Sequence, residues 1–214
     1  MLVIGLTGGI ACGKSTISAT LQELGAVIVD GDVLSRKLTA ADGTALPAIR
    51  TAFGDLVFHA DGTLDRRALG SVIFADDQAR AKLDDIMQPM LRSMIIRDIA
   101  AARKSNVAAC VLDMPLLYEK DLDVLCDRVW CAYIPEALQL ERLMARDGFS
   151  LIEAENRLRS QMPAEEKAAK ADVVIDTSGP IQYTKEYVIS LYAKEVGKPD
   201  GVNPQHPSSA QSQG

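Results

Sequence analysis

The sequence predicts an α/β fold in which a parallel β-sheet is covered by helices on both faces. Two observations support this. Short apolar segments recur along the chain, and their apolar residues are continuous rather than alternating, which is typical of strands buried on both faces. Helix-like segments lie between several of them, as in βαβ units. The expected strands are 2–7, 26–30, 107–113, 128–134 and 172–176, and the expected helices include 14–24, 136–146 and 181–195.

A glycine-rich loop follows the first expected strand. The segment GLTGGIACGKST has the spacing Gly8-x-x-x-x-Gly13-Lys14-Ser15, which matches the phosphate-binding loop pattern in its usual strand–loop–helix context. Glycines let successive backbone N–H groups point inward, and the N-terminus of the next helix adds partial positive charge. The sequence therefore predicts a nucleoside triphosphate site formed by Gly8, Gly9, Ile10, Ala11, Cys12, Gly13, Lys14, Ser15 and Thr16.

The polar residues of this loop have separate expected tasks. Lys14 would place its charge near the β and γ phosphates, so we count it among the catalytic residues. The Ser15 hydroxyl is the expected Mg²⁺ ligand, and Thr16 would donate toward a phosphate oxygen.

Acidic residues end the second and third expected strands. Because the carboxyl ends of parallel strands meet at one edge of a sheet, Asp30, Asp32 and Asp113 are expected near the loop. Asp32 lies beyond the strand end, so we favour it as the general base that accepts a proton from an attacking hydroxyl. A solvated turn at the strand end or a helix N-cap is the alternative role for Asp32, and Asp30 is divided evenly between a site role and a structural role. Asp113 would either reach the metal through water or cap the next turn.

The long section from residue 33 to residue 104 interrupts the strand–helix alternation. Two stretches, 66–74 and 78–104, have helical character, and Asp61-Gly62 indicates a turn. The section is too long for a simple crossover. We therefore predict a helical insertion beside the sheet, where a second substrate would bind.

Two arginines mark a lid after the fourth expected strand. Arg142 and Arg146 are four residues apart and therefore share one helix face. Ser150-x-x-Glu153 matches a capping box that opens the next helix. Arginines on such a lid would stabilise the charge of a transferred phosphoryl group, so both are predicted to be catalytic. Surface pairing with acidic neighbours is the alternative, worth under about 1 kcal/mol.

Composition excludes several classes of function. The net charge of −6 argues against a nucleic-acid partner. The apolar runs are far shorter than the roughly 18 to 20 residues that cross a bilayer, and no signal pattern opens the chain, so we expect a cytoplasmic protein without membrane attachment. The four cysteines have no C-x-x-C spacing, which argues against a zinc site or a disulfide framework. The final residues, rich in Pro, Ser, Gln and Gly, are predicted to be disordered.

Taken together, the motifs resemble the dephospho-CoA kinase family, which uses ATP to phosphorylate the ribose 3′-hydroxyl of dephospho-CoA, giving coenzyme A and ADP in the last step of coenzyme A biosynthesis. The resemblance runs from Leu2 to about Tyr192. It rests on GLTGGIACGKST, VDGDVLSR, DGTLDRRALGSVIF, DMPLLYE, RLMARDGFSLIEAENRLRSQM and ADVVIDTSG, in the order typical of the family.

The resemblance implies a P-loop NTPase-type three-layer fold with ATP and Mg²⁺ as cofactors and dephospho-CoA as acceptor. Asp32 matches the family's base and Arg142 its lid arginine. The acceptor site is assigned to Asp32, Arg66, Pro89 and Leu116. The implied parts are a nucleotide-binding core (1–32, 105–137 and 168–196), a CoA-binding insertion (33–104), a lid (138–167) and a disordered tail (197–214).

The chain departs from the family pattern at three places. Ala11-Cys12 stands where Gly-Ser is usual, which predicts a stiffer loop and an activity sensitive to thiol oxidation. Gln88 precedes Pro89 where a histidine is usual, and Thr177 follows the last strand where an asparagine is common. An acceptor contact by the histidine and an adenine contact by the asparagine therefore do not transfer to this chain.

Other functions remain open at this point. A related P-loop kinase acting on a nucleoside monophosphate or a sugar acid would share most of these features. A guanine-nucleotide switch is disfavoured because no Asn-Lys-x-Asp motif occurs, although DTSG at 176–179 fits the Asp-x-x-Gly pattern. A non-catalytic ATP-binding module would leave Lys14, Asp32 and the lid arginines unexplained.

Overall fold

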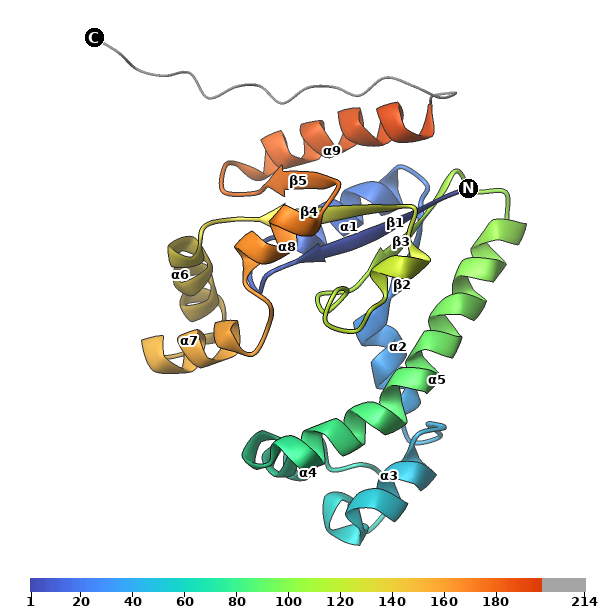
Figure 1. Ribbon diagram of the computed structural model, residues 1–214, viewed down its shortest axis with the longest axis vertical. Coiled ribbons are helices and arrows are strands. Elements are labelled where there is room, and N and C mark those ends of the chain that lie inside the picture. Colours follow the sequence, from blue (N-terminus) through green and yellow to red (C-terminus); the bar gives the residue numbers. More distant parts are fainter. Residues whose placement is uncertain (198–214) are drawn as a thin grey trace.

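The computed structural model describes residues 1–197 and confirms the parallel α/β architecture (Figure 1). Five parallel strands form one sheet in the order β2-β3-β1-β4-β5. The strands are β1 (Leu2–Gly8), β2 (Val27–Asp30), β3 (Ala109–Asp113), β4 (Arg128–Tyr133) and β5 (Val173–Asp176). The predicted tail lies outside the described residues, except for Gly197.

The strand order determines which chain segments meet at the carboxyl edge of the sheet. β1 lies in the centre, where Leu6 is in register with Asp113 of β3 and Gly8 with Ala132 of β4. Asp30, the last residue of β2, is in register with Asp113 as well. The phosphate-loop segment and the two acidic strand ends therefore share this edge.

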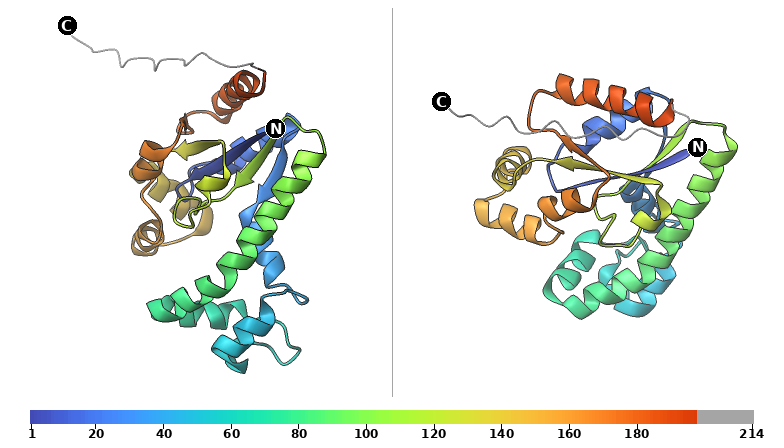
Figure 2. Two further views of the ribbon diagram at one scale, coloured as in Figure 1. Left: turned by 45° about the vertical axis from the view of Figure 1, so that its right-hand side comes forward. Right: turned by 45° about the horizontal axis from the view of Figure 1, so that its top comes forward.

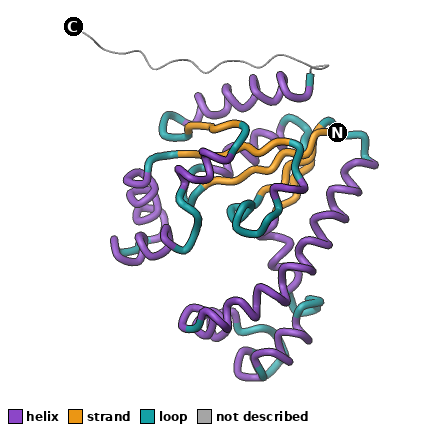
Figure 3. The backbone as a smooth tube through the Cα atoms, viewed as in Figure 1, coloured by secondary structure: helices purple, strands orange, loops and turns teal. Residues whose placement is uncertain are grey.

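Helices cover both faces of the sheet, as the continuous apolar strands predict (Figures 2 and 3). Neighbouring residues of β1 point to opposite sides: Val3 belongs to the core that includes α2 and α5, and Ile4 to the core that includes α1 and α9. The helices on these faces are α1 (Lys14–Glu23), α2 (Gly31–Leu38), α5 (Asp77–Lys104) and α9 (Ile181–Val196).

A helical arm occupies the section where helices were expected. It consists of α2, α3 (Leu46–Phe53), a short 3-10 turn (Asp55–Val57), α4 (Arg66–Ala75) and α5. Figure 1 shows α5 running from beside the sheet down to α3 and α4. Pro89 lies inside α5, where it removes one helical hydrogen bond. In Figure 1, α3 and α4 lie below the sheet, at the end of α5 farthest from it.

The segment between β4 and β5 forms three helices: α6 (Glu136–Asp147), α7 (Leu151–Arg159) and α8 (Ala164–Lys170). A second 3-10 turn (Asp123–Leu125) precedes β4. Gly148 ends α6 with a positive φ of 73°, and Ser150 and Glu153 form the predicted capping box of α7. Among residues 1–197, no helix has the length and apolar character needed to cross a bilayer.

Candidate active site

The phosphate loop ends at a helix N-terminus whose first turn is left open. Gly13 is the N-cap of α1, and no side chain of the described residues caps that turn. Its φ of 72° lies in the left-handed region, and a Cβ here would lie 3.3 Å from the Thr177 hydroxyl oxygen, so glycine is favoured at this position. Backbone N–H groups that lack a partner at the start of a helix form a ready anion site.

The loop packs tightly against α6 and α8. A Cβ at Gly9 would lie 2.5 Å from Oε1 of Gln139 on α6 and 3.2 Å from Cβ of Ala164 on α8. Ala11 has a φ of 59°, which is unfavourable for a residue with a side chain. The loop, which the sequence predicts to be stiff, therefore holds Ala11 in a backbone conformation that glycine would adopt with less strain.

Thr177 holds the loop from the end of β5. Its hydroxyl donates a 2.7 Å hydrogen bond to the carbonyl oxygen of Cys12, and its N–H donates to the carbonyl oxygen of Tyr133 at 3.1 Å. The residue is 6 % exposed. Sequence reasoning treated Thr177 as a departure from the family pattern and missed this contact, because nothing local to Thr177 points to Cys12.

Lys14 and Asp113 form an ion pair across β1 and β3. Asp113 is buried, and the N–H of the next residue, Met114, donates to the carbonyl oxygen of Leu6 at 3.0 Å, which continues the strand pairing. Asp113 therefore directly contacts the loop lysine instead of capping the next turn.

The Asp30 and Asp32 side chains have different surroundings. The Oδ1 atom of Asp30 accepts a 2.9 Å hydrogen bond from the N–H of Val33, so Asp30 is the N-cap of α2. The cap that sequence analysis weighed for Asp32 is therefore made by Asp30, and the Asp32 carboxylate is exposed in the first turn of α2.

A cavity of about 300 Å³, here called the arm cavity, lies between this edge and the helical arm. Asp32, Arg66 and Leu116, three of the four predicted acceptor residues, line it. Much of the remaining wall is apolar and comprises Leu64, Leu69, Ile73, Leu83, Met87, Leu91 and Met114. The fourth predicted residue, Pro89, lines a neighbouring cavity instead, because its position inside α5 turns it away from the Asp32 side.

Charged groups lie around the arm cavity. Nζ of Lys120 pairs with Oδ2 of Asp84 at 2.8 Å. A guanidinium N–H of Arg66 donates to the carbonyl oxygen of Thr39 at 3.3 Å, which ties the start of α4 to the end of α2. Gln88, where the family usually has histidine, also lines this cavity.

A second cavity, here called the nucleotide cavity, lies beside the phosphate loop and measures about 460 Å³. Its wall combines the loop, the predicted lid arginines and the segment after β5. The lining residues are Ala11, Gly13, Ser15, Thr16, Arg142, Arg146, Thr177, Gly179, Ile181 and Thr184.

The two arginines predicted to belong to a lid differ in their partners. A guanidinium N–H of Arg142 donates to the carbonyl oxygens of Thr177 at 3.0 Å and Ser178 at 3.3 Å. Arg146 pairs with Asp147, with Nε to Oδ1 at 2.8 Å, and the hydrogen bonds from Arg146 lower the pKa of the Asp147 carboxyl group. Arg146 thus has the surface pairing that sequence analysis gave as its alternative, although it also lines the nucleotide cavity.

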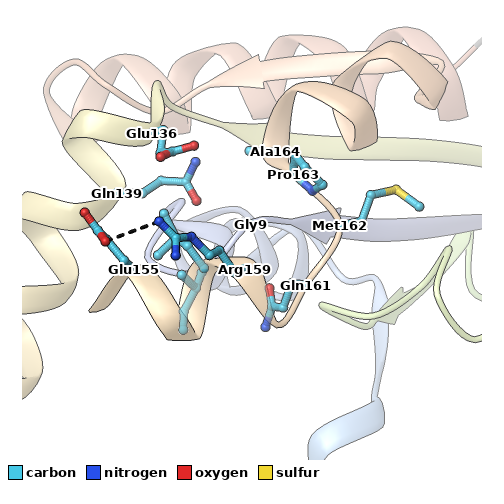
Figure 4. A pocket seen from close by; sticks show the side chains of 11 residues that line it. Gly9, Glu136, Gln139, Glu155, Arg159, Gln161, Met162, Pro163 and Ala164 are labelled. Atoms are coloured by element: carbon cyan, nitrogen blue, oxygen red, sulfur yellow. Dashed lines mark hydrogen bonds and ion pairs between the residues drawn. The ribbon is translucent and has the colours of Figure 1, made fainter. Parts of the chain in front are cut away.

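The other side of the loop faces α7. Figure 4 shows this third cavity, about 280 Å³ in volume, with Gly9 of the loop opposite Gln161 and Arg159. Nη2 of Arg159 lies 3.4 Å from Oε2 of Glu155. Sequence analysis did not single out Arg159.

Among residues 1–197, no cluster of three or more His, Cys, Asp or Glu side chains could hold a metal ion.

A parallel sheet with a phosphate loop, a helical segment beside it and a second cavity at the same edge defines the class of P-loop kinases. The fold is shared with shikimate kinase from Aquifex aeolicus, at a TM-score of 0.51 and 17 % identity over 92 % of this chain and 100 % of that one. Within this class, the chain belongs to the dephospho-CoA kinase family, whose sequence profile matches residues 2–182.

Individual relatives support the same assignment. The chain is 44 % identical to a dephospho-CoA kinase from Geobacter sulfurreducens over 91 % of this chain and 98 % of that protein. It is 43 % identical to one from Carboxydothermus hydrogenoformans, over 90 % and 93 % of the two chains. The solved dephospho-CoA kinase from Campylobacter jejuni has a TM-score of 0.70 and 28 % identity, over 91 % of this chain and 97 % of that one. The protein is thus a kinase, and the reaction of its family is ATP-dependent phosphorylation of dephospho-CoA.

Proposed function

We propose that ATP binds with its phosphates in the loop 8–16 and dephospho-CoA in the arm cavity, and that Asp32 is the general base for phosphoryl transfer to the ribose 3′-hydroxyl. The observation that carries this proposal is the position of Asp32. It is two residues beyond Asp30, which is in register with the Lys14 partner Asp113, and it also lines the arm cavity. One carboxylate thereby borders the second cavity and comes directly after a strand that ends beside the Lys14 partner Asp113.

The proposed step needs little covalent chemistry from the protein. The 3′-hydroxyl oxygen attacks the γ-phosphorus, the bond from that phosphorus to the β–γ bridging oxygen breaks, and the hydroxyl proton passes to Asp32. Coenzyme A and ADP are the products. The protein has to hold the alcohol in line and to stabilise negative charge, which the loop N–H groups and Lys14 support.

Ser15 and Asp113 are the residues we propose to hold Mg²⁺, directly or through water. Hydroxyl and carboxylate oxygens are the donors that Mg²⁺ prefers, and this ion keeps several waters and phosphate oxygens in its shell, so it needs no closed protein cluster. When bound, the ion would neutralise charge on the β and γ phosphates. Lys14 would then contact both Asp113 and the nucleotide.

The nucleotide base would occupy the nucleotide cavity. Thr16 and Gly13 connect this cavity to the phosphate loop, and Arg142 borders it with a planar guanidinium group, which is suited to stacking on a base. Arg142 and Arg146 remain proposed catalytic residues, because closure of the segment 138–167 would bring cations onto the transferred group.

The arm cavity supplies groups that fit dephospho-CoA. Arg66 and Lys120 offer positive charge for its diphosphate, and the apolar wall around Leu69 and Met87 fits less polar parts of the acceptor. Pro89 remains a predicted acceptor contact from the neighbouring cavity. The part boundaries predicted from the sequence, the cytoplasmic location and the lack of a nucleic-acid partner also remain predictions.

The decisive experiment incubates the purified protein with MgATP and dephospho-CoA and identifies the products by mass spectrometry. We expect coenzyme A, with the added phosphate on the 3′-oxygen, and ADP in equal amounts. A panel with nucleoside monophosphates and sugar acids should give little turnover. Efficient turnover of one of these acceptors without turnover of dephospho-CoA would overturn the proposal.

A further inference from the structure

Lys167 on α8 is completely buried, with 0 % of its surface exposed. Lysine is almost never fully buried unless it is paired. Here the ammonium group pairs with Oε1 of Glu119 at 2.8 Å and donates a hydrogen bond of 2.6 Å to the carbonyl oxygen of Pro115. Neither Lys167 nor Glu119 belongs to the proposed site, so the pair needs a separate explanation.

Both partners of Lys167 are themselves connected to other segments. Oε1 of Glu119 accepts a 2.9 Å hydrogen bond from the N–H of Met162. The carbonyl oxygen of Pro115 accepts a 3.1 Å hydrogen bond from the hydroxyl of Thr7. We call these five residues, Thr7, Pro115, Glu119, Met162 and Lys167, the Lys167 network.

The Lys167 network joins three parts that the proposed reaction requires to be in register. Thr7 immediately precedes the phosphate loop, and Pro115 is two residues beyond Asp113. Met162 lines the cavity that faces Gly9, in the stretch that returns from α7 to the core. Ala164, one turn before Lys167, packs on Gly9 itself. One buried ammonium group therefore fixes the loop strand, the Asp113 segment and the base of the lid relative to one another.

Stability alone does not explain such a pair. Removing two charges from water is costly, and replacing a buried ion pair by apolar groups of similar size is often neutral or stabilising. A charged group with directional hydrogen bonds, in contrast, holds the packed segments in one relative position, whereas an apolar contact would allow several. We propose that Lys167 is a positioning residue for the kinase reaction, which holds the Asp113 segment and the lid base in register with the phosphate loop. The inference rests on the proposed site.

The test compares Lys167→Met, Glu119→Gln and the double variant. Lys167→Met leaves the Glu119 charge unpaired and should lower the melting temperature strongly. The double variant removes both charges and should recover most of that stability. We expect the kcat of the double variant to remain about 10- to 100-fold below that of the unchanged protein, because small misplacements of reacting groups lower the reaction rate. The KM for MgATP should change much less.

A matched control separates positioning from general loss of stability. Val188→Ala removes buried side-chain atoms of α9 in the core cluster that includes α1, and Val188 is none of the hydrogen-bond or ion-pair partners of the network. It should lower the melting temperature and leave kcat unchanged at a temperature where the protein stays folded. The inference would be overturned if the double variant regained stability and had an unchanged kcat. It would also be overturned if Val188→Ala lowered kcat as much as the double variant does when the two variants have the same melting temperature.

Thr7→Val decides the question if the double variant does not fold. It removes one neutral hydrogen bond of the network and keeps the ion pair, so kcat should fall by about 2- to 10-fold at little cost in melting temperature. An unchanged kcat in Thr7→Val would count against positioning. Lys14→Ala tests the proposed site separately. Full activity of this variant would refute the proposed site. If Lys14→Ala is inactive while the double variant keeps an unchanged kcat, the Lys167 inference alone is refuted.

Discussion

Lys14, the first residue of α1, is ion-paired with Asp113, the last residue of β3. The two residues lie 99 positions apart and meet because β1 and β3 are neighbours in the sheet. The pair directs the Lys14 ammonium group toward the carboxyl edge of the sheet. Asp113 thus orients Lys14, and it is the carboxylate that we propose to reach a metal ion beside Ser15.

Asp113→Asn tests the proposed link to the metal. The amide has the same shape as the carboxylate but no charge, so it should weaken Mg²⁺ binding and leave Lys14 less well oriented. We expect the Mg²⁺ concentration that gives half-maximal activity to rise about 10- to 100-fold, as for other groups that support a metal site. A titration of activity with Mg²⁺ at saturating ATP measures this. An unchanged Mg²⁺ requirement would remove Asp113 from the proposed metal site.

Asp32→Asn tests the proposed general base. Because the amide cannot accept the hydroxyl proton, kcat should fall by about 100- to 10,000-fold, while KM for MgATP stays nearly constant. Steady-state kinetics with dephospho-CoA separate the two parameters. Asp30→Asn is the matched control, since asparagine also caps helices well; it should keep near-normal kcat and melting temperature. Similar losses in both variants would point to a general disturbance of α2.

Arg142→Ala and Arg146→Ala together test the lid arginines. Arg142 donates to the segment after β5, whereas Arg146 is already paired with Asp147. We expect Arg142→Ala to lower kcat/KM for MgATP by at least about tenfold, an energy of roughly 1.4 kcal/mol. Arg146→Ala should have the smaller effect. A decrease in kcat alone would support action on the transition state. A change in KM alone would support a role in nucleotide binding. If both variants are as active as the unchanged protein, the lid role is refuted.

Ala11→Gly should relieve backbone strain in the phosphate loop. Ala11 has a φ of 59°, and a left-handed conformation costs a residue with a Cβ about 1 to 2 kcal/mol. The extra freedom of glycine in the unfolded chain offsets about 0.4 to 1 kcal/mol of this. The variant should be more stable by up to about 1.6 kcal/mol, which is a rise of roughly 2 to 4 °C in melting temperature for each kcal/mol. Thermal unfolding with and without ATP measures the change, and a lower melting temperature would contradict the strain.

Cys12 should resist thiol reagents, contrary to the sensitivity expected from the sequence. It is 1 % exposed, and burial raises the pKa of its thiol above the ordinary value. Burial also raises the pKa of Cys110 to about 11 and those of Cys126 and Cys131 to about 12. Since the thiolate is the reactive form and forms only as the pH approaches these raised values, activity should survive iodoacetamide at neutral pH. The unfolded chain should be alkylated at all four cysteines. Rapid inactivation by modification of Cys12 in the folded protein would contradict this.

The sequence by itself determined the features that depend on neighbouring residues. The phosphate loop, the continuous apolar strands, the helical section after Asp32 and the capping box at Ser150 all arise from local spacing, backbone freedom and turn chemistry. These interactions act within a few residues, so their pattern is visible in the chain. The carboxyl-edge rule for parallel strands also sufficed to expect Asp32 and Asp113 near the loop.

The tertiary structure decided everything that depends on which distant segments meet. The strand order pairs Lys14 with Asp113, Thr177 reaches Cys12 across 165 residues, and Lys167 finds Glu119 and Pro115. The fold also decides that Arg142 donates hydrogen bonds to the backbone carbonyl oxygens of Thr177 and Ser178. It decides as well that Asp30 caps α2. Such contacts follow from packing of the whole sheet and its helices, because burial compels polar groups to find partners wherever the chain brings them.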